Sequence, residues 1–158
     1  MDDQQLDSLM DLALAEARAA LEHDDVPIGA VVVRLDTGVV VARRHNEREL
    51  RHDPTAHAEL LAIRDAATVL GRWRLNDCAL VVTLEPCPMC AGAAVAARLG
   101  LVAFGAPDPN AGAFGSLYHL GADPRLNHEV RVVDGIRAAE SAALLQEFFA
   151  ARRNRASP

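Results

Sequence analysis

Apolar residues recur every three or four positions in residues 6–22, "LDSLMDLALAEARAALE", and this spacing predicts an amphipathic helix. The apolar face of this helix consists of Leu6, Leu9, Met10, Ala13, Leu14, Ala17 and Leu21. A second helix is expected from about Thr55, a suitable N-cap after Pro54, to Leu70, and Gly71 stops it.

Apolar runs without helical spacing predict the strands. "GAVVVRL" and "VVVAR", separated by "DTG", are typical of a β-hairpin in which Gly38 supplies the turn. "ALVVTL" at 79–84 and "LVAFG" at 101–105 are continuous apolar runs, as in buried strands. "HEVRVV" at 128–133 predicts a last strand.

Two more helices complete the pattern. One begins near Pro88 and ends before Gly100, and the other is "IRAAESAALLQEFFAARR". The order αββαβαββα predicts an α/β fold, in which a central mixed sheet has helices on both faces. Residues 106–127 are rich in Gly, Pro, Asn and Asp, which predicts a long loop, and loops of this length are often functional.

The length and composition are typical of one domain. With 158 residues and 51% apolar residues the chain can bury a substantial core, so we expect a single domain over 1–158. No run approaches the roughly 20 apolar residues of a membrane span. The N-terminus is acidic where a secretory signal would be basic. We therefore expect a soluble cytoplasmic protein.

The formal charge of −6 argues against a nucleic-acid partner, because binding to phosphate depends on positive charge. That argument concerns the total charge and leaves a local basic surface open. All 16 basic residues are arginines, whose planar guanidinium group suits phosphate. Arg152, Arg153 and Arg155 crowd the last seven positions, so we expect a basic tail at about 152–158.

Two of the three cysteines, Cys87 and Cys90, form a Cys-x-x-Cys motif at the predicted start of a helix. Residues three apart share a helix face, so both sulfurs can reach one metal ion, and the helix N-terminus favours thiolates. Redox dithiols and halves of zinc ribbons share this spacing. A ribbon needs a second pair, which the sequence lacks. Cys78 is expected to be a buried apolar thiol.

His57, in "PTAHAEL", also begins a helix after a turn. One His and two Cys make three ligands and leave a fourth position for water, as in catalytic zinc sites. Such a zinc lowers the pKa of its water to about 7. Glu59 can lie beside that water and carry protons. The alternative is a surface His-x-Glu pair unrelated to the cysteines, which the second motif disfavours.

"HAE" at 57–59 followed by "PCPMC" at 86–90 matches the signature of zinc-dependent nucleobase deaminases. The similarity runs nearly from end to end through "VPIGAVVV", "HNERE", "RHDPTAHAEL", "TLEPCPMCAGA", "FGAPDPNAGAFGSL", "LNHEV" and "LLQEFFAARR". In these segments the chain resembles the bacterial tRNA-specific adenosine deaminases. The resemblance implies a three-layer α/β/α cytidine-deaminase-like fold with a central mixed five-stranded sheet.

The resemblance also implies a reaction. Members of that family convert adenosine to inosine at the wobble position of an arginine tRNA anticodon, as homodimers with the tRNA reaching across the subunits. By analogy, one Zn²⁺ per subunit activates the water that attacks C6 of adenine. Glu59 then protonates the ring nitrogen and the departing ammonia, while the base lies flipped out of its loop.

Several substrate contacts are implied by the resemblance alone. Asn46 corresponds to a base contact, and the backbone N–H groups of Ala58 and Cys87 border the same pocket. Asp108 corresponds to a contact with the RNA backbone near the target, where a ribose hydroxyl distinguishes RNA from DNA. Taken by itself, an Asn directly after a strand is more often a turn residue.

The last helix matches the family's helix that borders the anticodon loop, through Phe148, Phe149, Arg152 and Arg153. Without the resemblance, one of the two Phe would be expected to pack the helix onto the sheet, and the arginines would be a solvated tail. Pro107 and Asn110 stand where relatives often carry basic residues, which alters the expected footprint of the tRNA.

Two alternatives use the same residues. A deaminase of a free base or nucleoside, such as guanine or cytosine, would need the same zinc site, and the acidic total charge would be no obstacle. A catalytically silent zinc-binding subunit would only help a partner hold RNA. Such subunits lack the proton-carrying glutamate, whereas Glu59 is present here.

Overall fold

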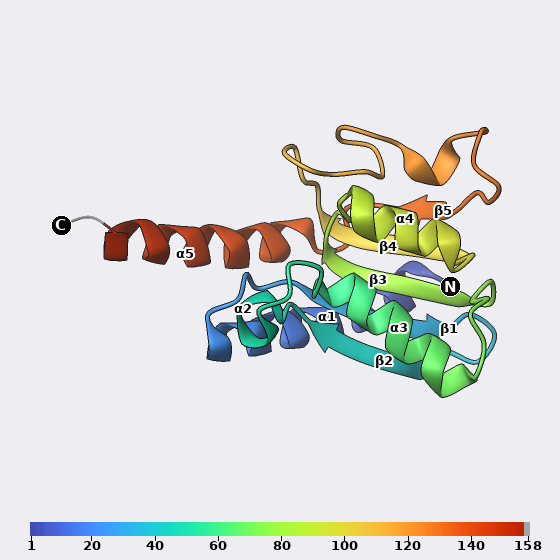
Figure 1. The fold of residues 1–158 in the computed structure, drawn as a ribbon, viewed down its shortest axis with the longest axis horizontal. Helices are drawn as coiled ribbons and strands as arrows, with labels where there is room; N and C mark the ends of the chain where they lie inside the picture. Colours follow the sequence, from blue (N-terminus) through green and yellow to red (C-terminus); the bar gives the residue numbers. More distant parts are fainter. Residues whose placement is uncertain (157–158) are drawn as a thin grey trace.

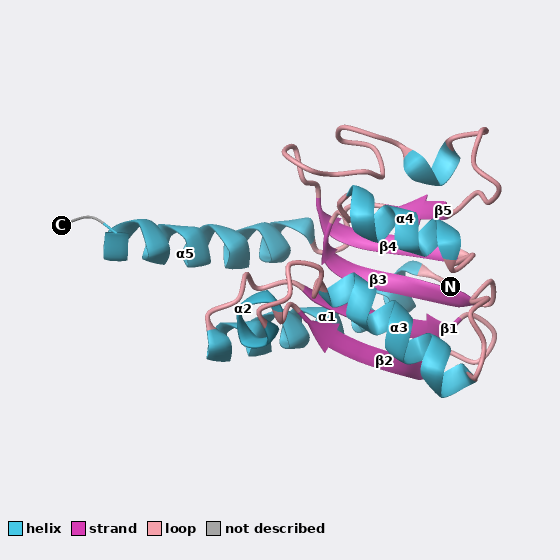
Figure 2. Ribbon diagram, in the orientation of Figure 1, coloured by secondary structure: helices cyan, strands magenta, loops and turns pink. Residues whose placement is uncertain are grey.

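A five-stranded sheet runs through the centre of the protein (Figures 1 and 2). This computed structural model describes residues 1–156. The strands are β1 (Gly29–Arg34), β2 (Val40–His45), β3 (Cys78–Leu84), β4 (Leu101–Ala106) and β5 (Arg131–Val133). Their order is β2-β1-β3-β4-β5. Strand β1 is antiparallel to both of its neighbours, whereas β3, β4 and β5 are parallel, which confirms the predicted mixed sheet.

The central strands are predominantly apolar because helices cover both faces of the sheet. In β1, Ala30 and Val32 belong to one core cluster, whereas Val31 and Val33 belong to the other. All four side chains are fully buried. Successive side chains of a strand point to opposite faces, so a strand covered on both sides has no position left for a polar residue.

Helices form the two outer layers. They are α1 (Asp3–Ala19), α2 (Arg48–Arg51), α3 (Ala58–Leu70), α4 (Pro88–Ala96) and α5 (Ala138–Ala156), with 3₁₀ turns η1 (Ala20–His23) and η2 (Leu120–Ala122). Helices α3 and α4 cover one face of the sheet and α1 covers the other (Figure 1). The three-layer α/β/α fold is therefore confirmed. Helix α5 contacts β4 and then projects well beyond the sheet (Figure 1).

Some element boundaries differ from those predicted. Helix α3 begins after His57 rather than at Thr55, because Asp53 accepts hydrogen bonds from the N–H group and the hydroxyl of Thr55 and holds it in a turn. Helix α1 begins earlier than predicted, at Asp3, because Asp2 and Gln5 form a capping box. The short helix α2 was not predicted.

The last strand is shorter than predicted. Only Arg131–Val133 pair with β4, because the N–H group of Val130 donates to Gly121 of the long loop instead. The long loop predicted at residues 106–127 is present, and the short 3₁₀ turn η2 is its one helical element.

The predicted basic tail is helical over most of its length. Residues 152–156 continue α5, and residues 157 and 158 lie outside the described part of the chain. Among residues 1–156, no helix combines the length and apolar character needed to cross a bilayer. The division of the chain into one domain over 1–158 stays a prediction.

Candidate active site

Strand directions bring the sequence motifs to one edge of the sheet. Strands β2 and β3 both run antiparallel to β1, and β4 runs parallel to β3, so the carboxyl ends of all three lie at the same edge. Asn46 follows β2, Cys87 lies three residues after β3, and Asp108 lies two residues after β4. Helices α3 and α4 begin at this edge as well (Figure 1). Open α/β sheets commonly place their ligand sites here.

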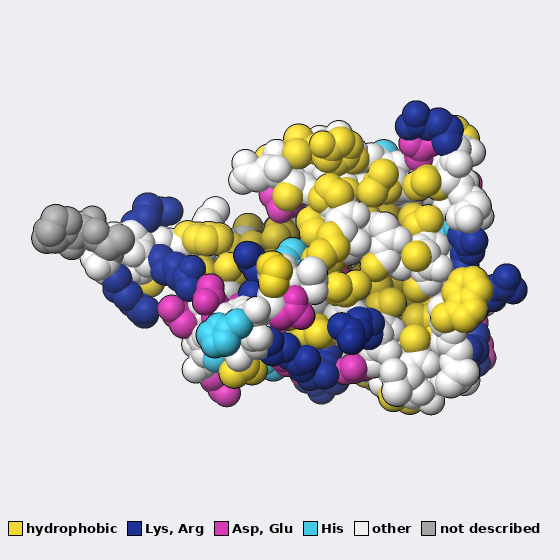
Figure 3. Space-filling model, viewed as in Figure 1, with side chains coloured by type: hydrophobic (Ala, Val, Ile, Leu, Met, Phe, Trp, Pro, Cys, Tyr) yellow, Lys and Arg dark blue, Asp and Glu magenta, His cyan; other side chains and the backbone are white. Residues whose placement is uncertain are grey.

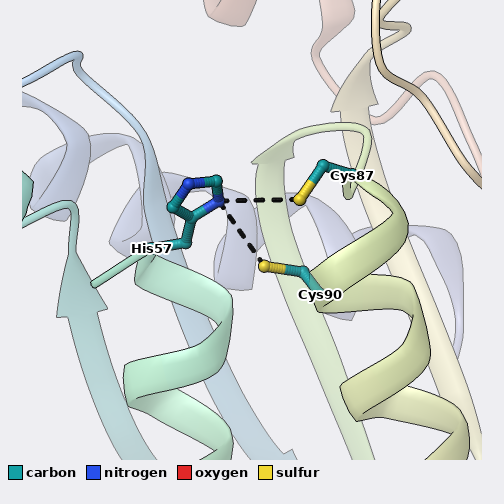
Figure 4. A group of neighbouring side chains, drawn as sticks. All are labelled: His57, Cys87 and Cys90. Carbon is teal, nitrogen blue, oxygen red and sulfur yellow. Dashed lines mark hydrogen bonds between the residues drawn. The ribbon is translucent and has the colours of Figure 1, made fainter. Parts of the chain in front are cut away.

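His57, Cys87 and Cys90 meet where α3 and α4 begin (Figure 4). His57 and Cys87 are the N-cap residues of the two helices, yet neither side chain caps its own helix. Both point across the gap instead. His57 Nδ1 lies 3.7 Å from the Cys87 sulfur and 3.6 Å from the Cys90 sulfur. This metal-ligand cluster joins residues that are about 30 positions apart in the chain.

Hydrogen bonds within the cluster divide the two thiols into a donor and an acceptor. The hydrogen bond from Cys90, assisted by one from His57, lowers the pKa of Cys87 to about 3, although burial opposes this shift. The same interaction with Cys87, together with burial, raises the pKa of Cys90. The interaction with Cys87 also raises the pKa of His57. A thiolate, the form that binds metals, is thus favoured at Cys87.

The geometry of the cluster fits a zinc ion. In a tetrahedral site with Zn–S of about 2.3 Å and Zn–N of about 2.1 Å, a sulfur and a nitrogen ligand are separated by about 3.6 Å. The two sulfur–nitrogen distances in the cluster match this value. Three protein ligands leave one tetrahedral position for water or substrate, as in catalytic sites.

Glu59 lies in the first turn of α3, beside the cluster. Its side chain is only 3% exposed, and among residues 1–156 its Oε2 atom has no hydrogen-bond partner. Burial raises its pKa to about 7, and the charge of His57 opposes this shift. A buried carboxylate oxygen without a hydrogen-bond partner is costly, and such atoms concentrate at functional sites. Glu59 is therefore poised to exchange a proton near neutral pH.

Asn46 supplies the cap that α3 does not receive from its own N-cap residue. Its side chain is buried, and its Oδ1 atom accepts a hydrogen bond of 2.9 Å from the N–H group of Ala58. This contact satisfies a free N–H group of the first turn and leaves the imidazole of His57 available to the cluster. The same contact engages the Ala58 N–H group, which the family resemblance places at the base pocket.

The long loop after β4 carries Asp108, and it depends on a residue that sequence reasoning missed. Glu85 is 2% exposed and accepts hydrogen bonds from the N–H groups of Asp108, Phe114 and Ser116. Burial alone would raise its pKa, but the hydrogen bonds, led by that from the Ser116 hydroxyl, hold the pKa below its usual range. The sequence did contain a signal for this role, because Glu85 directly follows the apolar run at 79–84. A charged residue buried at the end of such a strand needs hydrogen-bond partners.

The two Phe residues of α5 face different surroundings. Phe149 is 43% exposed and lines a cavity with Pro107, Asp108 and Asn110 of the long loop. Phe148 is buried, and it lines a second cavity with Leu21 and Asp24. The cavity shared by Phe149 and Asp108 brings two of the predicted RNA contacts together.

The arginines of α5 lie on the projecting end of the helix (Figure 3). The guanidinium group of Arg152 lies 4.7 Å from the centre of the Phe148 ring and donates a hydrogen bond of 2.8 Å to the carbonyl oxygen of Asp24. Arg153 is exposed. These residues do not join the metal-ligand cluster, so any role of theirs concerns binding rather than chemistry.

The remaining cysteine and the other histidines lie outside the cluster. Cys78 is fully buried, and burial raises its pKa to about 11, in agreement with the predicted inert thiol. His23 pairs with Asp25, and His45 pairs with Glu16. These contacts give the two histidines structural partners.

Fold and site together define a deaminase, and comparison with known proteins agrees. A sequence model of the MafB19-like deaminase family matches residues 3–153. The chain is 48% identical over 137 residues to the tRNA-specific adenosine deaminase of Bacillus subtilis, covering 87% of this chain and 84% of that protein. The chain therefore belongs to the bacterial tRNA-specific adenosine deaminase family, as its motifs predicted.

Two solved structures extend the comparison. One, from a study of A-to-I editing by tRNA:A34 deaminases at the wobble position, has a TM-score of 0.83 and 46% identity, and covers 87% of this chain and 99% of that chain. A guanine deaminase from Nitrosomonas europaea has a TM-score of 0.77 and 28% identity, and covers 91% of this chain and 84% of that chain. The fold is thus shared by deaminases of polymeric and of small substrates.

Proposed function

We propose that this protein is a zinc-dependent hydrolase that converts adenosine to inosine at the wobble position of an arginine tRNA anticodon, releasing ammonia. The proposal depends on the buried carboxylate of Glu59 beside the three-ligand cluster, because its Oε2 atom has no hydrogen-bond partner among residues 1–156. The 48% sequence identity between this chain and a tRNA-specific adenosine deaminase supports tRNA as the substrate. We further propose one deaminase domain that acts in the cytoplasm as a homodimer, following the family.

His57, Cys87 and Cys90 would hold one zinc ion per subunit. When bound, zinc supplies a Lewis acid that lowers the pKa of a water ligand to about 7, so that a nucleophile is available at neutral pH. Cys90 is buried, whereas His57 and Cys87 are partly exposed, and the three side chains supply three of the four ligands of a tetrahedral ion. The residues present therefore suit a hydrolytic site rather than a closed structural one.

Glu59 would move the protons of the reaction. Hydrolysis adds water across C6 of adenine and expels the amino group, so one proton must leave the water and the departing nitrogen must be protonated. Oε2 of Glu59 has no partner among residues 1–156 that would compete for that proton. The carboxylate would take one proton from the water and pass it to the ring nitrogen, and would then pass the second proton of that water to the amino group, which leaves as ammonia.

Other residues would orient the RNA. Asn46, which follows β2 and caps α3, would contact the flipped base. Asp108 and Phe149 line one cavity, and they would receive the RNA backbone and an unstacked base. The arginines of α5 would contact phosphate, for which the guanidinium fork is suited.

The test is deamination of an arginine tRNA anticodon stem-loop by the purified zinc-loaded protein, with inosine located by sequencing. Free adenosine, cytosine and guanine are assayed in parallel for ammonia release. Inosine is expected at the wobble position alone. Glu59→Ala is expected to lower the rate about 10³-fold, because positioned acid–base groups contribute that much. Glu129→Ala, which removes an exposed glutamate, serves as the matched control and should edit normally.

The similarity to a guanine deaminase favours the second candidate, hydrolysis of a free base. Ammonia from a free base, with the stem-loop unchanged, would keep the zinc mechanism and overturn the proposed substrate. Retention of the protein on tRNA that falls steeply with salt would support a polynucleotide, because phosphate contacts release counterions. Full turnover by Glu59→Ala would exclude the proposed proton-carrying role of Glu59, whereas a wild-type protein that deaminates none of these substrates would point to a silent subunit.

A further inference from the structure

Glu85 is a buried carboxylate whose four hydrogen bonds in the described residues all come from one loop. It directly follows β3. Its Oε1 atom accepts from the N–H groups of Phe114 and Ser116, each at 3.0 Å. Its Oε2 atom accepts from the N–H group of Asp108 at 2.9 Å and from the hydroxyl of Ser116. The loop of residues 107–118 is thus wrapped around a single charged group.

At Gly112 the loop packs directly against this carboxylate and leaves no space for a side chain. A Cβ atom at Gly112 would lie 2.3 Å from Oε2 of Glu85 and 2.6 Å from the carbonyl oxygen of Asp108. Gly112 also donates a hydrogen bond of 2.8 Å to that carbonyl. Next along the loop, Ala113 donates to the carbonyl of Pro86 at 2.9 Å. The loop therefore closes on the segment that leads directly into Cys87.

We propose that Glu85 is a positioning residue that holds the loop of residues 107–118, and with it Asp108, in place beside the active site for binding of RNA. This inference rests on the proposed function. Its argument is geometric: one carboxylate joins the segment before Cys87 to the loop that shares a cavity with Phe149. The chemistry at Glu59 would not depend on Glu85, but the fit of the RNA would.

A carboxylate is required at position 85 because each of its two oxygens accepts two hydrogen bonds. An isosteric amide can keep only one accepting oxygen. The amide oxygen of Gln at position 85 would stay opposite the N–H groups of Phe114 and Ser116, since reversing the amide would leave two N–H groups facing a donor. The amide NH₂ can then donate to the Ser116 hydroxyl. The N–H group of Asp108 loses its acceptor, so Glu85→Gln should release the Asp108 end of the loop selectively.

The test compares Glu85→Gln with Asp77→Asn in the zinc-loaded protein. Asp77 is a matched control, because it directly precedes β3 at the opposite end from Glu85 and pairs with Arg72. Hydrogen exchange of the Asp108 amide should accelerate in Glu85→Gln, with Phe114 less affected. KM for the anticodon stem-loop should rise about tenfold, the effect of one buried hydrogen bond to a charged group. Neither kcat nor the zinc content should change by more than about twofold.

Two further variants keep the test decisive if Glu85→Gln does not fold. Gly112→Ala retains the carboxylate but forces the loop away from it, and Ser116→Ala removes one exposed hydroxyl donor. Both should raise KM, Gly112→Ala more than Ser116→Ala. An unchanged KM together with unchanged exchange in residues 107–118 overturns the inference. So does a fall in kcat or zinc content with KM unchanged, which would place the effect of Glu85 at Cys87.

The wild-type protein separates this inference from the proposed function. If wild type forms no inosine in the stem-loop, the proposed function fails whatever the variants do. If wild type edits the stem-loop and the Glu85 and Gly112 variants edit it with the same KM, only the positioning role of Glu85 fails.

Discussion

The metal-ligand cluster and the end of α5 are built in opposite ways. The cluster lies at the starts of two helices that pack on fully buried strands, and Cys90 within it is itself fully buried. The end of α5 projects beyond the sheet and carries exposed side chains such as Phe149 and Arg153 (Figure 1). The proposed chemistry, which needs precise placement, thus rests on buried elements, whereas the proposed contacts to RNA would extend from the body of the protein.

The contrast extends to charge. The chain as a whole is acidic, with a formal charge of −6, but arginines concentrate at the end of α5 (Figure 3). Asp24 pairs there with Arg152 and Arg155. An RNA phosphate would have to compete with this carboxylate, although exposed ion pairs are weak and exchange readily.

The largest expected effect comes from breaking the cluster. Cys90→Ser should abolish stoichiometric zinc binding and deamination, because a buried thiolate ligand is lost. It should also remove the stabilisation by zinc, about 4 kcal/mol when free zinc is a thousand times its Kd. Zinc content and urea unfolding with and without a chelator measure both effects. Cys78→Ala is the control and should keep its zinc. If Cys90→Ser retained full zinc occupancy, the proposed ligand set would be wrong.

A smaller effect is expected at Asn46, where support of the site and contact with substrate coincide. Asn46→Ala should lower the free energy of unfolding by about 1–2 kcal/mol, because the N–H group of Ala58 loses its cap. Asn46→Asp keeps an acceptor at the helix N-terminus and should retain the stability. Both should lower kcat/KM if the side-chain amide also contacts the base. Equal stability of Asn46→Ala and wild type in urea unfolding would exclude the capping role.

The smallest effect is expected at Phe149, the exposed one of the two neighbouring Phe residues of α5. Phe149→Ala should weaken binding of the stem-loop by about 1 kcal/mol, or roughly fivefold in Kd, through the loss of a stacking surface. Its stability should change by less than about 0.5 kcal/mol, since the side chain is substantially exposed. Phe148→Ala is the counterpart and should instead lower the stability by about 3 kcal/mol. A Phe149→Ala protein with unchanged Kd in a titration would remove Phe149 from the RNA contacts.

Local patterns in the sequence were sufficient for much of this molecule. Runs rich in apolar and β-branched residues predicted all five strands, and they are longest in the central strands, where helices cover both faces of the sheet. The spacing of Cys87 and Cys90 predicted a shared ligand site, because residues three apart lie on one face of a helix. Gly71 was correctly expected to end α3, where it adopts a left-handed conformation with φ of 64°. Each of these inferences depends on residues that lie close together in the sequence.

The contacts between segments that are distant in the chain could not be predicted from local patterns and are seen only in the tertiary structure. Asn46 caps a helix that begins 12 residues later, and Glu85 binds N–H groups 23 to 31 residues away. Phe148 and Phe149 are identical neighbours, yet one is buried and the other exposed. Adjacent residues of a helix point in directions about 100° apart, so the surface that the helix packs against determines which side chain is covered. That surface is formed by the rest of the fold, and no local pattern specifies it.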